Sequence, residues 1–210
     1  GERIAVMPTA RDHKRLLEDD LGPNTGGMGA FAPVPGITQT DIDIWSKTIL
    51  QPAIAGLRAE GRPYVGVLYA GLMLTSKGPK LLEFNCRFGD PEAQVLLPLL
   101  ESDLLSVMLD CAQGQMNPAS VIWKTKSAAT VVLASGGYPS QYETGFPISG
   151  IDAVNALETC RVYQAGTRVQ ENEILTSGGR VLCVTALGDD LKLALQNAYK
   201  GVAKIQFSGA

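Results

Sequence analysis

The sequence lacks the cysteine spacing of a structural zinc site. Its four cysteines are Cys86, Cys111, Cys160 and Cys183, and no C-x-x-C motif brings any two of them close in the chain. Zinc sites in small domains depend on such short spacings. We therefore expect no zinc, and free thiols in a reducing cytoplasm.

Several other sites are missing as well. There is no G-x-x-x-x-G-K-[ST] phosphate loop and no G-x-S-x-G nucleophile motif, and His13 is the only histidine. The formal net charge is -3 and no block of basic residues occurs, so we expect no nucleic-acid partner. No segment approaches the roughly 20 apolar residues of a membrane span, so we expect no membrane partner.

What is present indicates a folded chain. Of its 210 residues, 45% are hydrophobic and 19% are charged, which predicts a buried core. Near residue 118 the pattern changes to short strands separated by glycine-rich turns. We place a boundary in Met116–Trp123, giving a first domain at 1–120 and a smaller, β-rich domain at 121–210.

Hydrophobic periodicity and turn residues predict most of the elements. A helix capped by Thr40 should kink at Pro52 and end at Gly61. The other expected elements are strands at 64–74 and 80–86, helices beginning at Asp90 and at Ser102–Asp103, strands at 128–134, 161–164 and 180–187, and a helix at 190–200. Thr176–Arg180 is expected to be a hairpin turn.

Both ends of the sequence look internal to a domain. Arg3–Met7 has the composition of a strand, and the sequence stops just after Phe207, close to another expected short strand. We therefore expect this chain to be part of a longer one.

The most informative motif is the run Glu83–Glu92, Glu-Phe-Asn-Cys-Arg-Phe-Gly-Asp-Pro-Glu. On a strand, alternation places Glu83, Asn85 and Arg87 on one face. A carboxylate and an amide oxygen side by side suit Mg²⁺, which takes few protein ligands and completes its shell with substrate phosphates. Arg87 can contact a phosphate. The alternative is a half-exposed strand whose polar face is solvated.

Two further segments are candidates. Gly22–Pro35 contains several glycines and prolines, so we expect an irregular loop whose backbone amides can approach an anion, or one that only fixes local shape. Asp12-His13-Lys14-Arg15 is a charge cluster just before it. This cluster is either a solvated turn or a contact for a phosphate or carboxylate.

Three motifs closely resemble those of the glycinamide ribonucleotide synthetases, also called phosphoribosylamine–glycine ligases, in sequence, order and spacing: Asp12–Arg15, Gly22–Ala30 and Glu83–Glu92. Leu68–Met73, Ala165–Thr167 and Gly178–Leu182 add to the resemblance, which covers almost the whole chain. It implies an α+β fold: the C-terminal, metal-side half of an ATP-grasp domain followed by a small β-rich domain that is truncated at its end.

The resemblance also implies a reaction and residue roles. The family joins glycine to 5-phosphoribosylamine through a glycyl phosphate, using ATP and Mg²⁺ or Mn²⁺. By position, Glu83 and Asn85 are the metal ligands, and Arg87 is the catalytic residue that stabilises phosphate charge. All three are expected to lie in the binding site for ATP and its metal. The expected substrate-binding residues are Asp12, Lys14, Gly26, Gly27, Gly89 and Asp90.

The family's N-terminal and lid domains have no counterpart in these 210 residues, so the chain alone is expected to be inactive. Two alternatives stay open. One is another ATP-grasp carboxylate–amine ligase, such as a biotin carboxylase relative, against which the Gly22–Gly29 loop argues. The other is a non-catalytic module that retains the fold.

Overall fold

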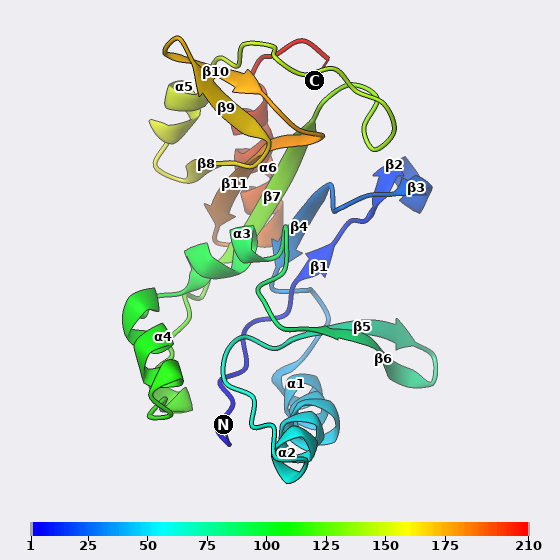
Figure 1. The fold of residues 1–210 in the computed structure, drawn as a ribbon, viewed down its shortest axis with the longest axis vertical. Coiled ribbons are helices and arrows are strands. Elements are labelled where there is room, and N and C mark those ends of the chain that lie inside the picture. Colours follow the sequence, from blue (N-terminus) through cyan, green and yellow to red (C-terminus); the bar gives the residue numbers. More distant parts are fainter. Residues whose placement is uncertain (1, 210) are drawn as a thin grey trace. The chain divides into compact units, whose positions relative to one another are not determined.

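The computed structural model describes residues 2–209, which form two compact units of non-contiguous segments (Figure 1). The first unit contains the residues up to Thr9, Val34–Gly89 and Leu100–Lys124. The second contains Ala10–Pro33, Asp90–Leu99 and the residues from Thr125 onward. Helices and antiparallel sheets occur together, which confirms the expected α+β class.

The first unit consists of helices and one hairpin. Its elements are α1 (Gln39–Trp45), a π-helical segment (Ser46–Leu50), α2 (Gln51–Ala59), β5 (Tyr69–Thr75), β6 (Gly78–Asn85), α4 (Leu104–Ala112) and a short 3-10 helix (Pro118–Ser120). Strands β5 and β6 form a two-stranded antiparallel sheet, with a register shift between Gly71 and Leu72.

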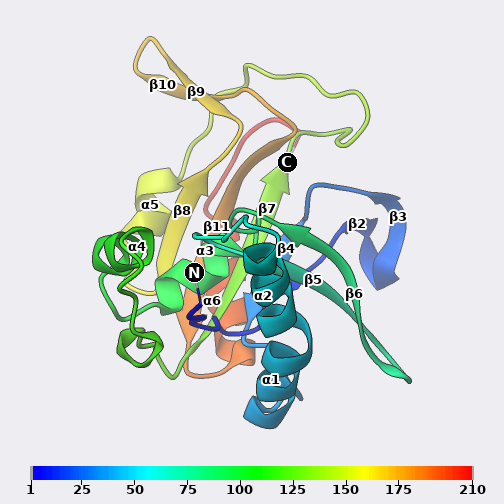
Figure 2. The same cartoon turned by 60° about the horizontal axis from the view of Figure 1, so that its bottom comes forward.

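The predicted first helix is confirmed with two changes. Its cap is Thr38 rather than Thr40, because Thr38 and Asp41 form a reciprocal capping box. A π-helical segment lies between α1 and α2, which follow each other along the chain (Figure 2), and Pro52 is the second residue of α2. A proline has no amide hydrogen for the helical ladder, and the wider π turn accommodates that gap.

The second unit is built on one antiparallel sheet of five strands in the order β1-β4-β7-β11-β8. The strands are β1 (Arg11–Asp12), β4 (Gly29–Ala32), β7 (Ser127–Ala134), β8 (Cys160–Gln164) and β11 (Arg180–Gly188). Small hairpins add β2 (Arg15–Leu17) with β3 (Leu21–Asn24), and β9 (Thr167–Gln170) with β10 (Glu173–Thr176); a 3-10 helix (Glu18–Asp20) joins β2 to β3.

The helices of this unit pack on the sheet. They are α3 (Ala93–Leu96) followed by a 3-10 turn (Leu97–Leu99), α5 (Ile151–Asn155) and α6 (Leu191–Val202). The helix predicted at 190–200 is confirmed as α6, and Asp190 is its cap. Ala194, Ala198 and Gly201 form its buried face, and these small residues let α6 approach β7 and β11 closely. The core includes Val154, Val181, Leu182 and Val184.

Several sequence predictions are wrong in detail. Arg3–Met7 forms no strand, because hydrophobic composition alone does not supply a pairing partner. The stretch at 22–36 is not wholly irregular, since it contains β4 and most of β3. Gly29 makes β4 possible, because a Cβ there would lie 2.6 Å from the carbonyl oxygen of Thr130 on β7.

One predicted turn and one predicted helix start also differ. Thr176–Arg180 is not a hairpin turn: β10 pairs with β9, whereas β11 pairs with β7 and β8. Helix α3 begins after Glu92 rather than at Asp90, because the Asp90 side chain is engaged elsewhere.

The proposed division into domains 1–120 and 121–210 remains a prediction. The compact units do not follow it as two contiguous segments, because β1 and β4 pair into the same sheet as β7. Within residues 2–209, no helix is both long and apolar enough to cross a membrane.

Candidate active site

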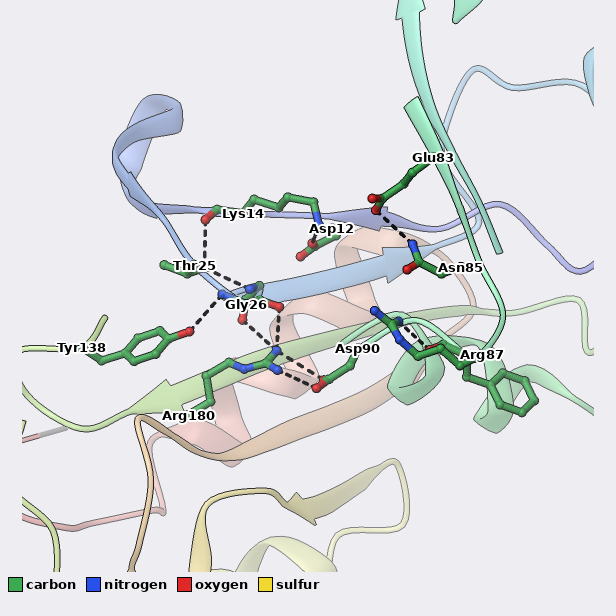
Figure 3. Close-up of polar contacts among 12 residues, drawn as sticks. Asp12, Lys14, Thr25, Gly26, Glu83, Asn85, Arg87, Asp90, Tyr138 and Arg180 are labelled. Atoms are coloured by element: carbon green, nitrogen blue, oxygen red, sulfur yellow. Dashed lines mark hydrogen bonds and ion pairs between the residues drawn. The ribbon is translucent and has the colours of Figure 1, made fainter. Parts of the chain in front are cut away.

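In the first unit, β6 carries Glu83 and Asn85 on one side of the strand. The Asn85 Nδ2 donates a hydrogen bond to Glu83 Oε1 at 2.9 Å, which confirms the alternation argument for these two residues (Figure 3). Asn85 Oδ1 and the carboxylate are thus adjacent hard oxygen donors. This donor set fits Mg²⁺ or Mn²⁺ as a half-site that substrate oxygens complete. Among residues 2–209 no cluster of three acidic, histidine or cysteine side chains offers a full set of protein ligands.

Arg87 and Gly89 lie beyond the end of β6. Arg87 is therefore not placed by strand alternation, although its side chain projects to the same side as Glu83 and Asn85 (Figure 3). Its Nη1 donates to the carbonyl oxygen of Phe88 at 2.8 Å, which turns the guanidinium back along its own segment. Gly89 is buried.

In the second unit, Asp12 on β1 is buried and pairs with Lys14. The Asp12 side chain is 5% exposed, the Lys14 side chain is 59% exposed, and Nζ lies 3.1 Å from Oδ2. Apart from this contact with Lys14, neither carboxylate oxygen of Asp12 has a hydrogen-bond partner among residues 2–209. The cluster is thus not simply a solvated turn: a buried carboxylate sits under an exposed ammonium group.

Burial raises the pKa of the Asp12 carboxyl, a hydrogen bond from Lys14 opposes the rise, and the nearby Glu92 adds to it. A raised pKa in the folded state means that the protonated form favours folding. That contribution is complete below the unfolded pKa of about 3.9 and is lost as the pH rises through the folded value.

Replacing Asp12 with asparagine is therefore expected to raise the thermal midpoint at pH 7. The advantage over wild type should shrink as the pH falls toward about 4, where the carboxyl becomes neutral. Thermal melts from pH 4 to 8 measure this. Asp189→Asn is the matched control, since Asp189 pairs with Lys126 but is 86% exposed. A lower midpoint for Asp12→Asn at pH 7 would contradict the argument.

In the glycine-rich loop Gly22–Gly29, every backbone amide from Thr25 to Met28 donates a hydrogen bond within the chain. Thr25 N and Met28 N donate to the carbonyl oxygens of Lys14 and His13. Gly26 N donates to the hydroxyl of Tyr138 at 2.9 Å, and Gly27 N donates to Thr25 Oγ1 at 3.0 Å. The loop therefore does not present an open cradle of amides, and its glycines serve close packing.

Asp90 and the glycine loop are brought together by Arg180. Arg180 Nη2 lies 2.5 Å from Asp90 Oδ2 and Nη1 lies 3.3 Å from Oδ1, a bidentate pair (Figure 3). The same Nη1 donates to the carbonyl oxygen of Gly26 at 2.8 Å. Sequence reasoning assigned no role to Arg180 or Tyr138. The Gly178–Leu182 motif contained the signal for Arg180, but nothing in the sequence pointed to Tyr138.

Models of two domains of one protein family match the chain. The ATP-grasp (A) domain of phosphoribosylglycinamide synthetase matches residues 1–93, and the C domain of the same synthetase matches residues 128–210. The chain belongs to the phosphoribosylglycinamide synthetase family. The resemblance seen in the motifs is thereby confirmed.

Relatives of this family occur in proteins of different length. The chain is 53% identical over 211 residues to the trifunctional purine biosynthetic protein adenosine-3 of Gallus gallus, covering 100% of this chain and 21% of that protein. It is 49% identical over 211 residues to the phosphoribosylamine–glycine ligase of Allochromatium vinosum, covering 100% of this chain and 49% of that protein. The chain thus spans about half the length of the latter and about a fifth of the former.

Two solved structures superpose well on this chain. The crystal structure of phosphoribosylamine–glycine ligase from Thermotoga maritima superposes with a TM-score of 0.88 at 34% identity, covering 100% of this chain and 51% of that one. A biotin carboxylase domain from Hydrogenobacter thermophilus gives a TM-score of 0.63 at 13% identity, covering 87% of this chain and 39% of that one, a likeness of fold alone. The expected partial ATP-grasp fold is confirmed.

Proposed function

We propose that this chain supplies the metal-side half of the active site of a phosphoribosylamine–glycine ligase in purine synthesis. The observation that carries the proposal is the Glu83–Asn85 pair on β6, inside the segment that matches the family's ATP-grasp domain. Glycine, 5-phosphoribosylamine and ATP are the proposed substrates. The cytoplasmic location remains a prediction.

The reaction has two steps. A glycine carboxylate oxygen attacks the terminal phosphorus of ATP, ADP leaves, and glycyl phosphate forms. The amine nitrogen of phosphoribosylamine then attacks the acyl carbon, phosphate leaves, and the amine loses a proton as the amide forms. A bound Mg²⁺ or Mn²⁺ offsets the negative charge of the phosphate oxygens.

Each candidate residue of this chain has a proposed role that follows from its chemical type. Glu83 and Asn85 would hold the metal through hard oxygens, and Arg87 would offer a forked cation to a phosphate. Lys14 offers an exposed ammonium group to the sugar phosphate, and Asp12 can hold an amine. Gly26, Gly27, Gly89 and Asp90 are the other residues proposed to bind the substrates.

The test is ADP release by the full-length enzyme that contains this chain. Release that requires both glycine and phosphoribosylamine supports the proposal. Release driven by bicarbonate would favour the carboxylase-type alternative, and no release with any of these substrates would favour a non-catalytic module. The isolated 210-residue chain should release none, because it spans about half of a ligase.

Lys14→Ala in the full-length enzyme is expected to raise the KM for phosphoribosylamine about tenfold or more, with a smaller effect on kcat. A hydrogen bond from a charged group contributes about 1.5–3 kcal/mol, which sets this scale. Steady-state kinetics with varied phosphoribosylamine measure it. Lys126→Ala is the control, because Lys126 forms an exposed ion pair with Asp189. An unchanged KM with a lower melting temperature would assign Lys14 to structure alone.

A further inference from the structure

Arg180 contacts two groups that are distant from it in sequence, the Asp90 carboxylate and the Gly26 carbonyl. It is the first residue of β11, and its side chain is 21% exposed. Its guanidinium donates to both oxygens of Asp90 and to the carbonyl oxygen of Gly26. Gln94 also donates to Asp90 Oδ1 at 2.9 Å, so the carboxylate is held from two sides.

The geometry of this contact requires an arginine. A planar fork can reach two carboxylate oxygens and a carbonyl oxygen at once, whereas a lysine ammonium is a single point of charge on a flexible stem. Lysine at this position keeps the charge and loses the simultaneous contacts. Arg180→Lys therefore separates geometry from electrostatics.

Gly26 is shaped by the same contact. Its φ is not in the left-handed region, so the backbone angle does not explain the glycine. An added Cβ would lie 2.9 Å from Arg180 Cζ and 3.0 Å from Nε, so the guanidinium occupies that space. Alanine at position 26 would displace Arg180 without removing its charge.

Tyr138 holds Gly26 from the other end of its peptide unit. The hydroxyl accepts the Gly26 amide hydrogen, while Arg180 binds the Gly26 carbonyl oxygen. The Tyr138 ring lies against Gly179, where an added Cβ would collide with it, next to Arg180 in sequence. Two residues of the C-terminal segment thus fix one turn of the N-terminal loop.

We propose that Arg180 is a positioning residue for the phosphoribosylamine site: it locks the Gly26–Gly27 turn and the Asp90 carboxylate into one binding arrangement. The turn also carries Thr25, whose hydroxyl donates to the carbonyl oxygen of Lys14 at 2.8 Å, so the lock extends to the backbone of a proposed phosphate ligand. This inference rests on the proposed ligase function.

The kinetic test compares Arg180→Lys with wild type in the full-length enzyme. The KM for phosphoribosylamine should rise about 10- to 100-fold, by analogy with the loss of residues that orient the ligands of a metal site. The KM for ATP should change little. Arg161→Lys is the matched control, because Arg161 also donates to backbone carbonyls, those of Asn155 and Cys160, in the same unit.

Hydrogen exchange supplies a readout that does not depend on activity. In Arg180→Lys and in Gly26→Ala, the amides of residues 25–28 should exchange faster than in wild type and in Arg161→Lys. Faster exchange together with a raised KM in both variants supports the proposal. Faster exchange with an unchanged KM overturns the positioning role.

Two other outcomes would also overturn the proposal. Unchanged exchange in Arg180→Lys shows that there is no lock. A raised KM in Arg180→Lys but not in Gly26→Ala shows that Arg180 contacts the substrate itself, and it too overturns the proposal. Failure of the wild-type enzyme to release ADP with glycine and phosphoribosylamine refutes the ligase function instead, and the exchange experiment still decides whether the lock exists.

Discussion

Glu83→Gln in the full-length enzyme is expected to lower kcat by about 10²–10³-fold, or roughly 3–4 kcal/mol, the range seen when a group that stabilises transition-state charge is removed. Glutamine keeps the length of the side chain and an oxygen that can accept the hydrogen bond from Asn85. The substitution therefore removes the negative charge that favours a bound divalent cation, and little else. Folding should be almost unaffected, because Glu83 is exposed.

The measurement is steady-state kinetics with Mg²⁺ and with Mn²⁺ titrated separately. The metal concentration needed for half-maximal rate should rise along with the fall in kcat. Glu101→Gln is the control, since it removes the charge of an exposed glutamate in the same unit. If kcat stays within a few-fold of wild type at every metal concentration, Glu83 is not a metal ligand and the polar face of β6 is merely solvated.

Local signals predicted this half-site well. The alternation of β6 is a property of the strand itself, so the contact between Glu83 and Asn85 follows from their spacing. The starts of α4 and α6 were likewise predictable, because Asp103 and Asp190 each act on the first turn of the helix that follows. The end of the strand was harder to predict. Strand β6 ends at Asn85, so Arg87 lies beyond the alternating pattern.

Long-range pairing could not be read in this way. The buried state of Asp12 depends on β1 pairing with β4, which in turn pairs with β7. Nothing in the spacing of Asp12, His13 and Lys14 indicates that pairing. The partners of Arg180 could not be predicted for the same reason, because Gly26 and Asp90 are distant from it in sequence.

The glycines of the Gly22–Gly29 loop are needed for several different structural reasons. Sequence composition indicated amides open to an anion, whereas every amide from Thr25 to Met28 is already bonded within the second unit. Gly26 gives room to a guanidinium, and Gly29 lets β4 approach β7. Gly27 combines a left-handed backbone, with φ of 111°, and crowded surroundings.

Gly27→Ala is accordingly expected to lower the free energy of unfolding by at least about 2 kcal/mol. An L residue in a sparsely allowed backbone region costs about 1–3 kcal/mol, and an extra methyl group in a packed site costs a similar amount. An added Cβ would collide with the Pro91 ring and would lie 2.7 Å from Asp12 Oδ1. The clash therefore falls partly on the buried carboxylate of Asp12, whose side chain is only 5% exposed.

Gly145→Ala separates the two contributions. Gly145 also has a positive φ, 93°, but a Cβ there would meet only Arg168 Nη2 at 3.5 Å, an ordinary contact. Denaturant unfolding of both variants, in the same full-length background, should show a clearly larger loss for Gly27→Ala. The difference between the two measures the close packing of Gly27 against Pro91 and Asp12. Equal losses would mean that backbone conformation alone requires glycine at position 27, and that the loop is not fixed against the buried carboxylate.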